Sequence, residues 1–402
     1  MKPPYTLSLR NLLYEKLRLR EVLREKLGLE SARKALSDYH ARKLPIQCGA
    51  TIHSVVGCTF RCVYCYLPDM GVSFENAQPY GLTGLEMALA LLGNKYFLPG
   101  LLGTYLAIGS LGEPLHPLGL KRTLEYVEAL ASTLHNPIQL STKALVPLEA
   151  AERLARISGA PINPMVTIVT LNHHRSLEPG APSPQLRLES IKRLRRAGLK
   201  PTLFLRPIIP GLESEIPEIL KLAKRQGAVS VVLGSLRVTP AIIGRLRRAG
   251  LPVGEILKRL GKPLREGRQV SIPSRDLKEA ALEEARRIGL TPLFSACCAN
   301  TLNMYLARGL RIPCAGLDFA GTLFCTKCPV DCASIKPLID LDEAKWALEK
   351  YVGLTSFRLR DDGLTLVVES SNPRKARRRL KARRPYVKMI ETAYRRRIRV
   401  EE

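Results

Sequence analysis

The chain of 402 residues is poor in aromatic residues, in acidic residues and in long apolar runs. Only 5% of its residues are aromatic, with a single Trp, so it offers few rings on which the bases of a nucleic acid single strand could stack. The most apolar stretch, residues 87–109, is interrupted by Asn94, Lys95 and Pro99, which argues against a membrane span. The first residues mix charges into their apolar positions and lack a small-residue cleavage site. We therefore expect a cytoplasmic protein without a secretory signal.

The shortage of acids leaves a large positive charge. The chain has 63 Lys and Arg against 36 Asp and Glu, a formal net charge of +27. Ion-pair networks need acids and bases in comparable number, so the excess favours a polyanionic partner such as RNA or DNA. Residues 371–402 alone carry 13 Lys and Arg against three acids, which makes the C-terminal tail a candidate anchor.

The ten cysteines of a chain with no export signal indicate metal or cluster binding in a reducing compartment, not disulfides. Three lie at positions 58–65 and six at 297–332, while Cys48 stands alone and is expected to be a core residue. The first group, with the spacing CxxxCxxC, consists of Cys58, Cys62 and Cys65. Three thiolates can hold three corners of a [4Fe–4S] cluster and leave one iron open for an exchangeable ligand. A structural zinc knuckle or simply buried cysteines are the alternatives.

This spacing, with the aromatic Tyr64 before the last cysteine, resembles the signature of the radical S-adenosylmethionine (SAM) enzymes. The resemblance implies that SAM binds the open iron, that Tyr64 packs on the cofactor, and that a low-potential donor supplies the electron. It also implies reductive cleavage of SAM to a 5′-deoxyadenosyl radical, which abstracts hydrogen from a substrate.

From residue 50 onward, apolar strand patterns alternate with helical ones, which predicts a parallel sheet of the α/β class. Six strands are expected at 50–56, 104–110, 138–142, 165–170, 201–209 and 229–236. Helices are expected near 82–94, 117–134, 147–158, 183–198, 213–226 and 239–249, and a helix at 276–289 leads to a further strand at 291–298. The count agrees with the partial (β/α)6 barrel of the radical SAM enzymes.

Further site candidates follow the ends of the predicted strands. Gly112 and Glu113 belong to a Gly-Glu-Pro turn that resembles the family segment contacting the amino group of SAM, and Thr142 and Lys143 end the third strand. Arg206 ends the fifth strand, where it could pair with a carboxylate or phosphate. The alternatives are an ordinary loop for the Gly-Glu-Pro turn, a solvated side chain for Lys143 and a surface ion pair for Arg206.

Over residues 50–250 the chain resembles the spore photoproduct lyase-like branch of the superfamily, through the Ser-Thr-Lys segment at 141–143 and the runs 177–183 and 206–211. Those lyases carry a hydrogen-donor cysteine just after the second strand, and this chain has none there. We therefore do not expect the specific repair activity.

The second cysteine group resembles the auxiliary-cluster region of the SPASM and twitch extensions. Cys314, Cys325, Cys328 and Cys332 have a spacing able to close a cluster or a zinc site, and Cys297 or Cys298 could replace one of them or act as a redox thiol. Iron–sulfur is favoured over zinc.

The sequence thus predicts four parts. They are a basic helical extension (1–44), a radical SAM partial barrel (45–255), a barrel extension with the second metal site (256–335), and a small basic α+β domain (336–402). The expected function is radical SAM chemistry on a nucleic acid. A protein or peptide substrate is the alternative, and a non-catalytic zinc protein that binds nucleic acid is a further one.

Overall fold

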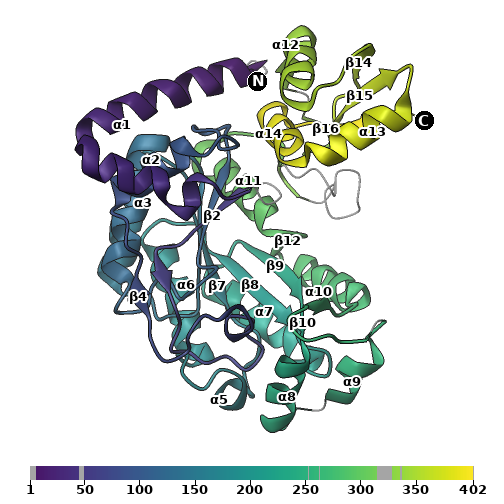
Figure 1. Ribbon diagram of the computed structural model, residues 1–402. Coiled ribbons are helices and arrows are strands. Elements are labelled where there is room, and N and C mark those ends of the chain that lie inside the picture. Colours follow the sequence, from purple (N-terminus) through teal and green to yellow (C-terminus); the bar gives the residue numbers. More distant parts are fainter. Residues whose placement is uncertain are drawn as a thin grey trace.

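The computed structural model describes residues 6–44, 49–251, 253–261, 263–314, 328–335 and 337–401. Its centre is a seven-stranded sheet in which every neighbouring pair of strands is parallel (Figure 1). The strands lie in the order β12, β9, β8, β7, β6, β5, β2. In chain order they are β2 Gly49–Ile52, β5 Tyr105–Ile108, β6 Ile138–Thr142, β7 Ile162–Thr167, β8 Thr202–Ile208, β9 Ser230–Ser235 and β12 Thr291–Leu293. Among the described strands the edges β2 and β12 do not pair, so the sheet is open and the predicted α/β partial barrel is confirmed.

A helix lies in every connection between successive strands, because parallel strands cannot be joined by a tight turn. These helices are α2 Gly84–Gly93, α3 Leu120–Leu134, α4 Leu148–Ala155, α5 His174–Leu177, α6 Pro184–Arg196, α7 Ile216–Arg225, α8 Pro240–Arg248, α9 Val253–Lys258 and α10 Arg275–Arg287. Alternate strand side chains such as Leu106, Leu140 and Leu203 are buried with these helices in the main core.

The first strand and the fourth differ from prediction at their ends. The expected strand at 50–56 is interrupted after Ile52, and its last part forms β3 Val55–Val56, which pairs antiparallel with β4 Gln78–Pro79. The expected strand at 165–170 begins earlier, at Ile162, because the polar Asn163 and the following proline concealed its start from the apolar pattern.

The predicted strand at 291–298 is wrong in its second half. It ends at Leu293, and Ser295 caps a new helix, α11 Ala296–Arg308, by accepting a hydrogen bond from the backbone of Cys298. Serine is a preferred N-cap residue, because its side-chain oxygen accepts a hydrogen bond from a backbone N–H of the first helical turn. Cys297 and Cys298 therefore lie in the first turn of a helix, not in the sheet.

Helix α11 packs on the face of the sheet that the connecting helices leave uncovered. Its Ala299 and Leu302 share a small core with Met165 of β7 and Val232 of β9, whose sequence neighbours point into the main core. Polar contacts add to this packing, since the Tyr105 hydroxyl lies 2.9 Å from Thr301 Oγ1.

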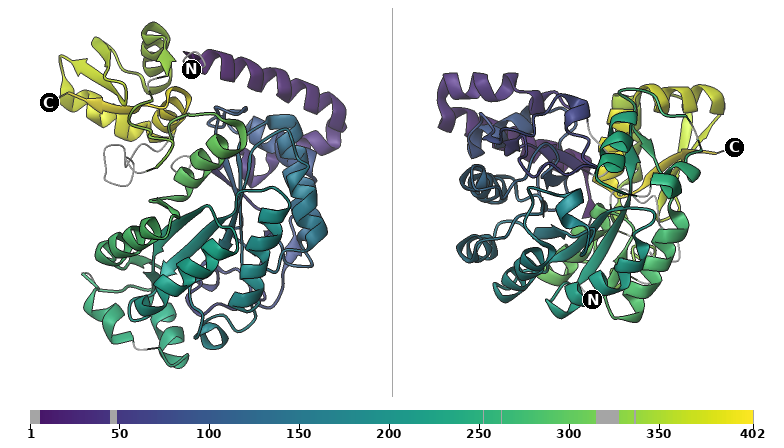
Figure 2. Two further views of the ribbon diagram at one scale, coloured as in Figure 1. Left: turned by 180° about the vertical axis from the view of Figure 1, so that it is seen from behind. Right: turned by 90° about the horizontal axis from the view of Figure 1, so that it is seen from below.

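The N-terminal segment lies against the C-terminal unit beside the sheet (Figure 2). Helix α1 Leu9–Ser37, bent at Gly28, runs from the C-terminal unit to the sheet's helical layer, and β1 Thr6–Leu7 pairs with β13 Leu338–Ile339. The unit contains α12 Leu341–Ala347, β14 Phe357–Asp361, β15 Thr365–Ser370, α13 Pro373–Ala382, α14 Arg384–Tyr394 and β16 Arg397–Val400. Strands β14 and β15 pair antiparallel, and β16 pairs parallel with β15. No described helix has both the length and the apolar character needed to cross a membrane.

Candidate active site

The loop that carries Cys58, Cys62 and Cys65 follows β3 at the carboxyl end of the sheet, the edge where such folds place their chemistry. Its root is fixed against the turn after β5. The Gly57 N–H donates to the Leu111 carbonyl over 3.0 Å, and Gly57 forms an isolated parallel bridge with Gly112. Gly57 has φ +87°, and an added Cβ would lie 1.9 Å from the Asn76 carbonyl oxygen, so only glycine fits.

Helix α8 holds the other end of this loop. Arg245 donates from Nε to the Val63 carbonyl (2.9 Å) and from Nη2 to the Cys65 carbonyl (2.6 Å). Asp69, whose side chain accepts from Thr239 over 2.7 Å, lies 3.6 Å from Arg245 Nη1. The cysteine backbone is therefore fixed by a residue 180 to 182 positions later in the chain.

The three thiols lie in a low-dielectric setting with one nearby cation. Cys62 is buried, whereas Cys58 and Cys65 are half-buried. Burial raises the pKa of all three thiols, that of Cys58 to about 11, and the ammonium group of Lys143 opposes this effect at each. Burial alone would lower the pKa of Lys143, but the negative charges of Cys62 and Glu178 outweigh it and the net shift is upward.

Tyr64 is held in the interior by a buried ion pair. Its hydroxyl donates to Glu178, and Glu178 Oε2 lies 2.5 Å from Arg187 Nη1, with both side chains 0% exposed. The Lys143 ammonium lies 5.6 Å from the centre of the Tyr64 ring. One face of the expected cofactor-packing residue therefore has a cation beside it, and its hydroxyl is anchored.

Sequence reasoning missed Glu178 and Arg187. The signal was present in helix α6, where Arg187 falls on the same buried stripe as Leu188, Ile191 and Leu194. A cation on an apolar stripe requires a buried acid, and the described chain supplies one in Glu178.

The fold brings together the residues after β5 and at the end of β6 that the sequence predicts to contact SAM. Glu113 is buried and accepts hydrogen bonds from the Leu115 N–H (3.1 Å), the Lys143 N–H (2.8 Å) and the Thr142 hydroxyl. Burial raises the pKa of Glu113 in spite of these bonds. At Gly112 an added Cβ would lie 2.6 Å from the Gly57 carbonyl oxygen, so its lack of a side chain serves the approach of the cysteine loop.

Arg206 lies two residues before the end of β8, near the same edge of the sheet. Its guanidinium lies 5.9 Å from the Phe204 ring, and its aliphatic part covers Gly234, where a Cβ would meet it at 2.3 Å. Partial removal from water and the charge of Arg237 lower its pKa. No acid among the described residues pairs with Arg206, which leaves it available to an anionic ligand.

The second cysteine group is placed only in part. Cys314 is buried, Cys328 and Cys332 are half-buried, and Cys325 lies outside the described residues. No three His, Cys, Asp or Glu side chains of the described chain surround one point closely enough to hold a single metal ion. A [4Fe–4S] cluster binds each thiolate through a different iron and does not require such convergence. The donor set of the first loop, three thiols with no carboxylate or imidazole among them, fits the cluster.

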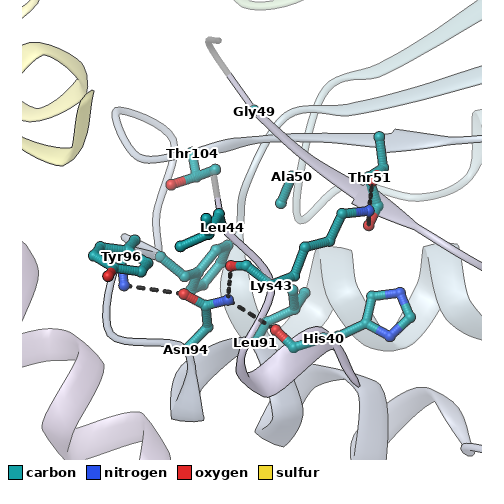
Figure 3. A pocket seen from close by; sticks show the side chains of 11 residues that line it. His40, Lys43, Leu44, Gly49, Ala50, Thr51, Leu91, Asn94, Tyr96 and Thr104 are labelled. Carbon is teal, nitrogen blue, oxygen red and sulfur yellow. Dashed lines mark hydrogen bonds between the residues drawn. The ribbon is translucent and has the colours of Figure 1, made fainter. Parts of the chain in front are cut away.

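A separate pocket lies at the other end of the sheet, beside the start of β2 (Figure 3). The Asn94 amide donates to the carbonyls of His40 and Lys43, each over 2.8 Å, and its oxygen accepts from the Tyr96 N–H at 3.0 Å. The Lys43 ammonium bonds the Thr51 hydroxyl. These polar groups satisfy one another, so the pocket is structural and we assign it no catalytic role.

Comparison with known proteins agrees with the cysteine loop. The sequence model of the radical SAM superfamily matches residues 52–223, which include all three cysteines of the loop. No curated protein matches the chain in sequence.

Among solved structures, a spore photoproduct lyase variant with bound AdoMet and dinucleoside spore photoproduct is 18% identical over 67% of this chain and 86% of its own, with a TM-score of 0.49. SuiB of Streptococcus suis bound to precursor peptide SuiA is 18% identical over 58% of this chain and 51% of its own, with a TM-score of 0.35. Residues 52–223 are a radical SAM domain, which supports the prediction that the chain is an enzyme.

Proposed function

We propose that Cys58, Cys62 and Cys65 bind a [4Fe–4S] cluster and that the enzyme cleaves SAM to act on a nucleic acid. The bound cluster supplies the electron that splits SAM into methionine and a 5′-deoxyadenosyl radical, which abstracts a hydrogen atom from the substrate. The observation that carries the proposal is the position of the cysteine loop at the carboxyl end of a parallel sheet, fixed at its root by the turn after β5 and at its end by Arg245.

The protein's own residues then bind and orient SAM. Glu113 and Thr142, joined by a hydrogen bond, suit the amino group of the methionine part, because a buried carboxylate pairs well with an ammonium. Lys143 or Arg206 would pair with the SAM carboxylate, and Tyr64, with the Gly112 backbone, would pack near the adenosine. A low-potential electron-donor protein is also required.

The test of this chemistry measures 5′-deoxyadenosine after dithionite reduction of the anaerobic enzyme. Cys→Ala changes at 58, 62 and 65 should each abolish it, since each removes one cluster corner. The matched control is Cys297→Ala, a cysteine outside the loop, which should keep the product. Product formation that survives all three changes would contradict the proposal.

The choice of nucleic acid as substrate is supported by the exposed face of α13. Its cations Arg374, Arg378 and Lys381 are exposed and have no ion pair with a described acid. Cations of this kind bind phosphates by releasing counterions, so affinity falls with salt. A peptide substrate would instead bind with little salt dependence, and the radical SAM domain argues against the non-catalytic zinc alternative.

The substrate test compares binding of labelled RNA and DNA to the chain and to a triple Gln variant of Arg374, Arg378 and Lys381. Each lost phosphate contact should lower the slope of log affinity against log salt by about 0.7 to 0.9, so the variant should lose about 2 to 3. The control carries the same change in net charge at cations that pair with acids: Arg24, Arg156 and Arg275. Equal slopes in all three proteins would remove α13 from the nucleic-acid interface.

A further inference from the structure

Strand β8 carries a cation near its carboxyl end, on the face of the sheet that α11 covers. Side chains alternate along a strand, so Arg206 lies on the same face as Phe204, which packs against the small core beneath α11. The aliphatic part of Arg206 crosses Gly234 of β9, where an added Cβ would lie 2.3 Å from Arg206 Cγ. The neighbouring strand therefore has a glycine where this arginine needs space, and Arg206 remains exposed.

Two further cations come from the elements that follow β9. Arg237 is exposed on β10 Arg237–Val238. Lys278 is half-buried in α10, close to its first residue, and helical side chains lean toward the amino end. The Ser274 hydroxyl before α10 donates to the Ser235 hydroxyl at the end of β9 over 2.8 Å. This bond fixes the start of α10 at the carboxyl end of the sheet.

The three cations lie close enough to influence one another. Partial burial and the charge of Arg237 lower the pKa of Arg206, and partial burial and the charge of Arg206 lower the pKa of Lys278. Burial raises the pKa of Tyr66, and the charges of Arg206 and Arg237 oppose this effect. The group of cations therefore extends to the residue that directly follows Cys65.

The acids next to Lys278 in the sequence do not neutralise this group. Asp276 pairs with Arg259 over 2.8 Å, and Glu279 pairs with Arg275 over 2.8 Å. In the part of the chain that the structure describes, none of the three cations forms an ion pair. Like charges held together without an acid, one of them near the positive end of a helix dipole, lower the stability of the fold. An anion bound among them would remove that repulsion.

We propose that Arg206, Arg237 and Lys278 form a site for a phosphodiester group of the nucleic acid substrate, beside the first cysteine loop. This inference rests on the proposed function. A guanidinium donates in a planar fork that matches phosphate oxygens, and cations from three elements can approach different oxygens of one tetrahedral group. One arginine would be enough for a carboxylate. The site assigns Arg206 to the substrate and leaves Lys143, which lies beside the Tyr64 ring, for the carboxylate of SAM.

The test measures binding of a short labelled oligothymidylate to the full anaerobic chain, together with the same probe made with uncharged methylphosphonate linkages. Arg206→Gln, Arg237→Gln and Lys278→Gln should each weaken binding of the charged probe about tenfold and lower its slope of log affinity against log salt by about 0.7. The matched control is Arg275→Gln on the same helix as Lys278, which removes a cation that already pairs with an acid and should bind as the unaltered chain does.

Equal affinity of the two probes for the unaltered chain, or unchanged binding of the charged probe by the three variants, would overturn the proposal. Competition by an acidic peptide that disappears in Arg206→Gln, with no difference between the two probes, would overturn it in favour of a carboxylate. Lys278→Gln should keep or raise the melting temperature, because it removes a repelled cation from the start of a helix. A loss of affinity in this variant is then not a loss of folding.

Chemical labelling gives a second measurement that needs no variant. Phenylglyoxal should modify Arg206 and Arg237 several times more slowly when the charged probe is present, whereas Arg275 should react equally fast with and without it. Equal rates at all three arginines would contradict the site. Deoxyadenosine formation by the unaltered chain without nucleic acid reports the SAM chemistry separately, and the salt slope of the α13 variant reports the outer surface. Failure of the proposed function can therefore be told apart from failure of this site.

Discussion

Replacing Arg187 with Met should destabilise the protein strongly and disturb the site through Tyr64. Arg187 and Glu178 are both 0% exposed, and the pair lies 2.5 Å apart beneath the cysteine loop. Arg187 also donates from Nε to the Pro182 carbonyl over 2.8 Å. Removal of one partner from a buried pair leaves an uncompensated charge, which costs about 3 to 5 kcal/mol. Among the described side chains, the Tyr64 hydroxyl would then remain as the hydrogen-bond donor to Glu178.

The assay is urea unfolding of the apoprotein for a double-mutant cycle. Arg187→Met should lose about 3 to 5 kcal/mol, and Glu178→Gln should also be destabilising because it leaves the guanidinium unpaired. The double variant Arg187→Met/Glu178→Gln should recover part of the loss, so that the coupling energy is at least about 2 kcal/mol. The control is Arg193→Met on the same helix, which pairs with the half-exposed Glu189 and should cost less than about 1 kcal/mol.

Two results would refute this reasoning. A loss below about 1 kcal/mol in Arg187→Met would mean that the pair does not compensate a buried charge. A double variant as unstable as the sum of the single ones would mean that the two side chains act independently. If the pair also positions Tyr64, the Arg187→Met protein should bind SAM more weakly while its iron content stays normal.

Three further predictions address the loop and the outer helix. Gly57→Ala should lower both cluster content and deoxyadenosine formation at least tenfold, since its Cβ would lie 1.9 Å from a carbonyl oxygen, whereas Gly71→Ala, with a similar φ of +73° but open space, should keep the cluster. Arg245→Met should lower cluster content by removing the bonds to the Cys65 and Val63 carbonyls, with iron per chain as the measurement. Burial lowers the pKa of Lys16 to about 7; the unfolded chain binds this proton more tightly, so Lys16 makes stability rise from about pH 7 to pH 10, and Lys16→Met should remove that rise in urea unfolding.

Local patterns were enough to predict the sheet and its helices. The strand at Ile138–Thr142 has the bounds that its apolar pattern indicates. Local patterns could not show where a helix N-cap would end an expected strand and start a helix. Residues 294–298 are apolar enough for a strand, but Ser295 bonds the backbone of Cys298 and starts a helix instead.

The candidate site likewise contains residues that the sequence predicts and residues that it does not. Cys58, Cys62 and Cys65 lie within eight residues, and Glu113, Thr142 and Lys143 lie at the ends of adjacent parallel strands, so spacing and topology alone bring them to one edge. Arg245 and Arg187 act on the site through contacts across 180 and 9 positions respectively, with Cys65 and Glu178. Neither of these separations along the sequence corresponds to a periodic pattern of helices or strands.

The buried charges explain why these unpredicted residues matter. An arginine on the inner stripe of a helix is costly unless an acid meets it, and a buried acid is costly unless cations compensate it. Lys143 lies beside both Cys62 and Glu178, and their negative charges raise its pKa. The cluster would bind these cysteines as thiolates in place of their protons, and a ligand that binds the folded state alone stabilises that state. We therefore expect the loaded enzyme to melt at a higher temperature than the apoprotein, and to lose this gain in the Cys58→Ala variant; equal melting temperatures would mean that the thiols do not bind the cluster.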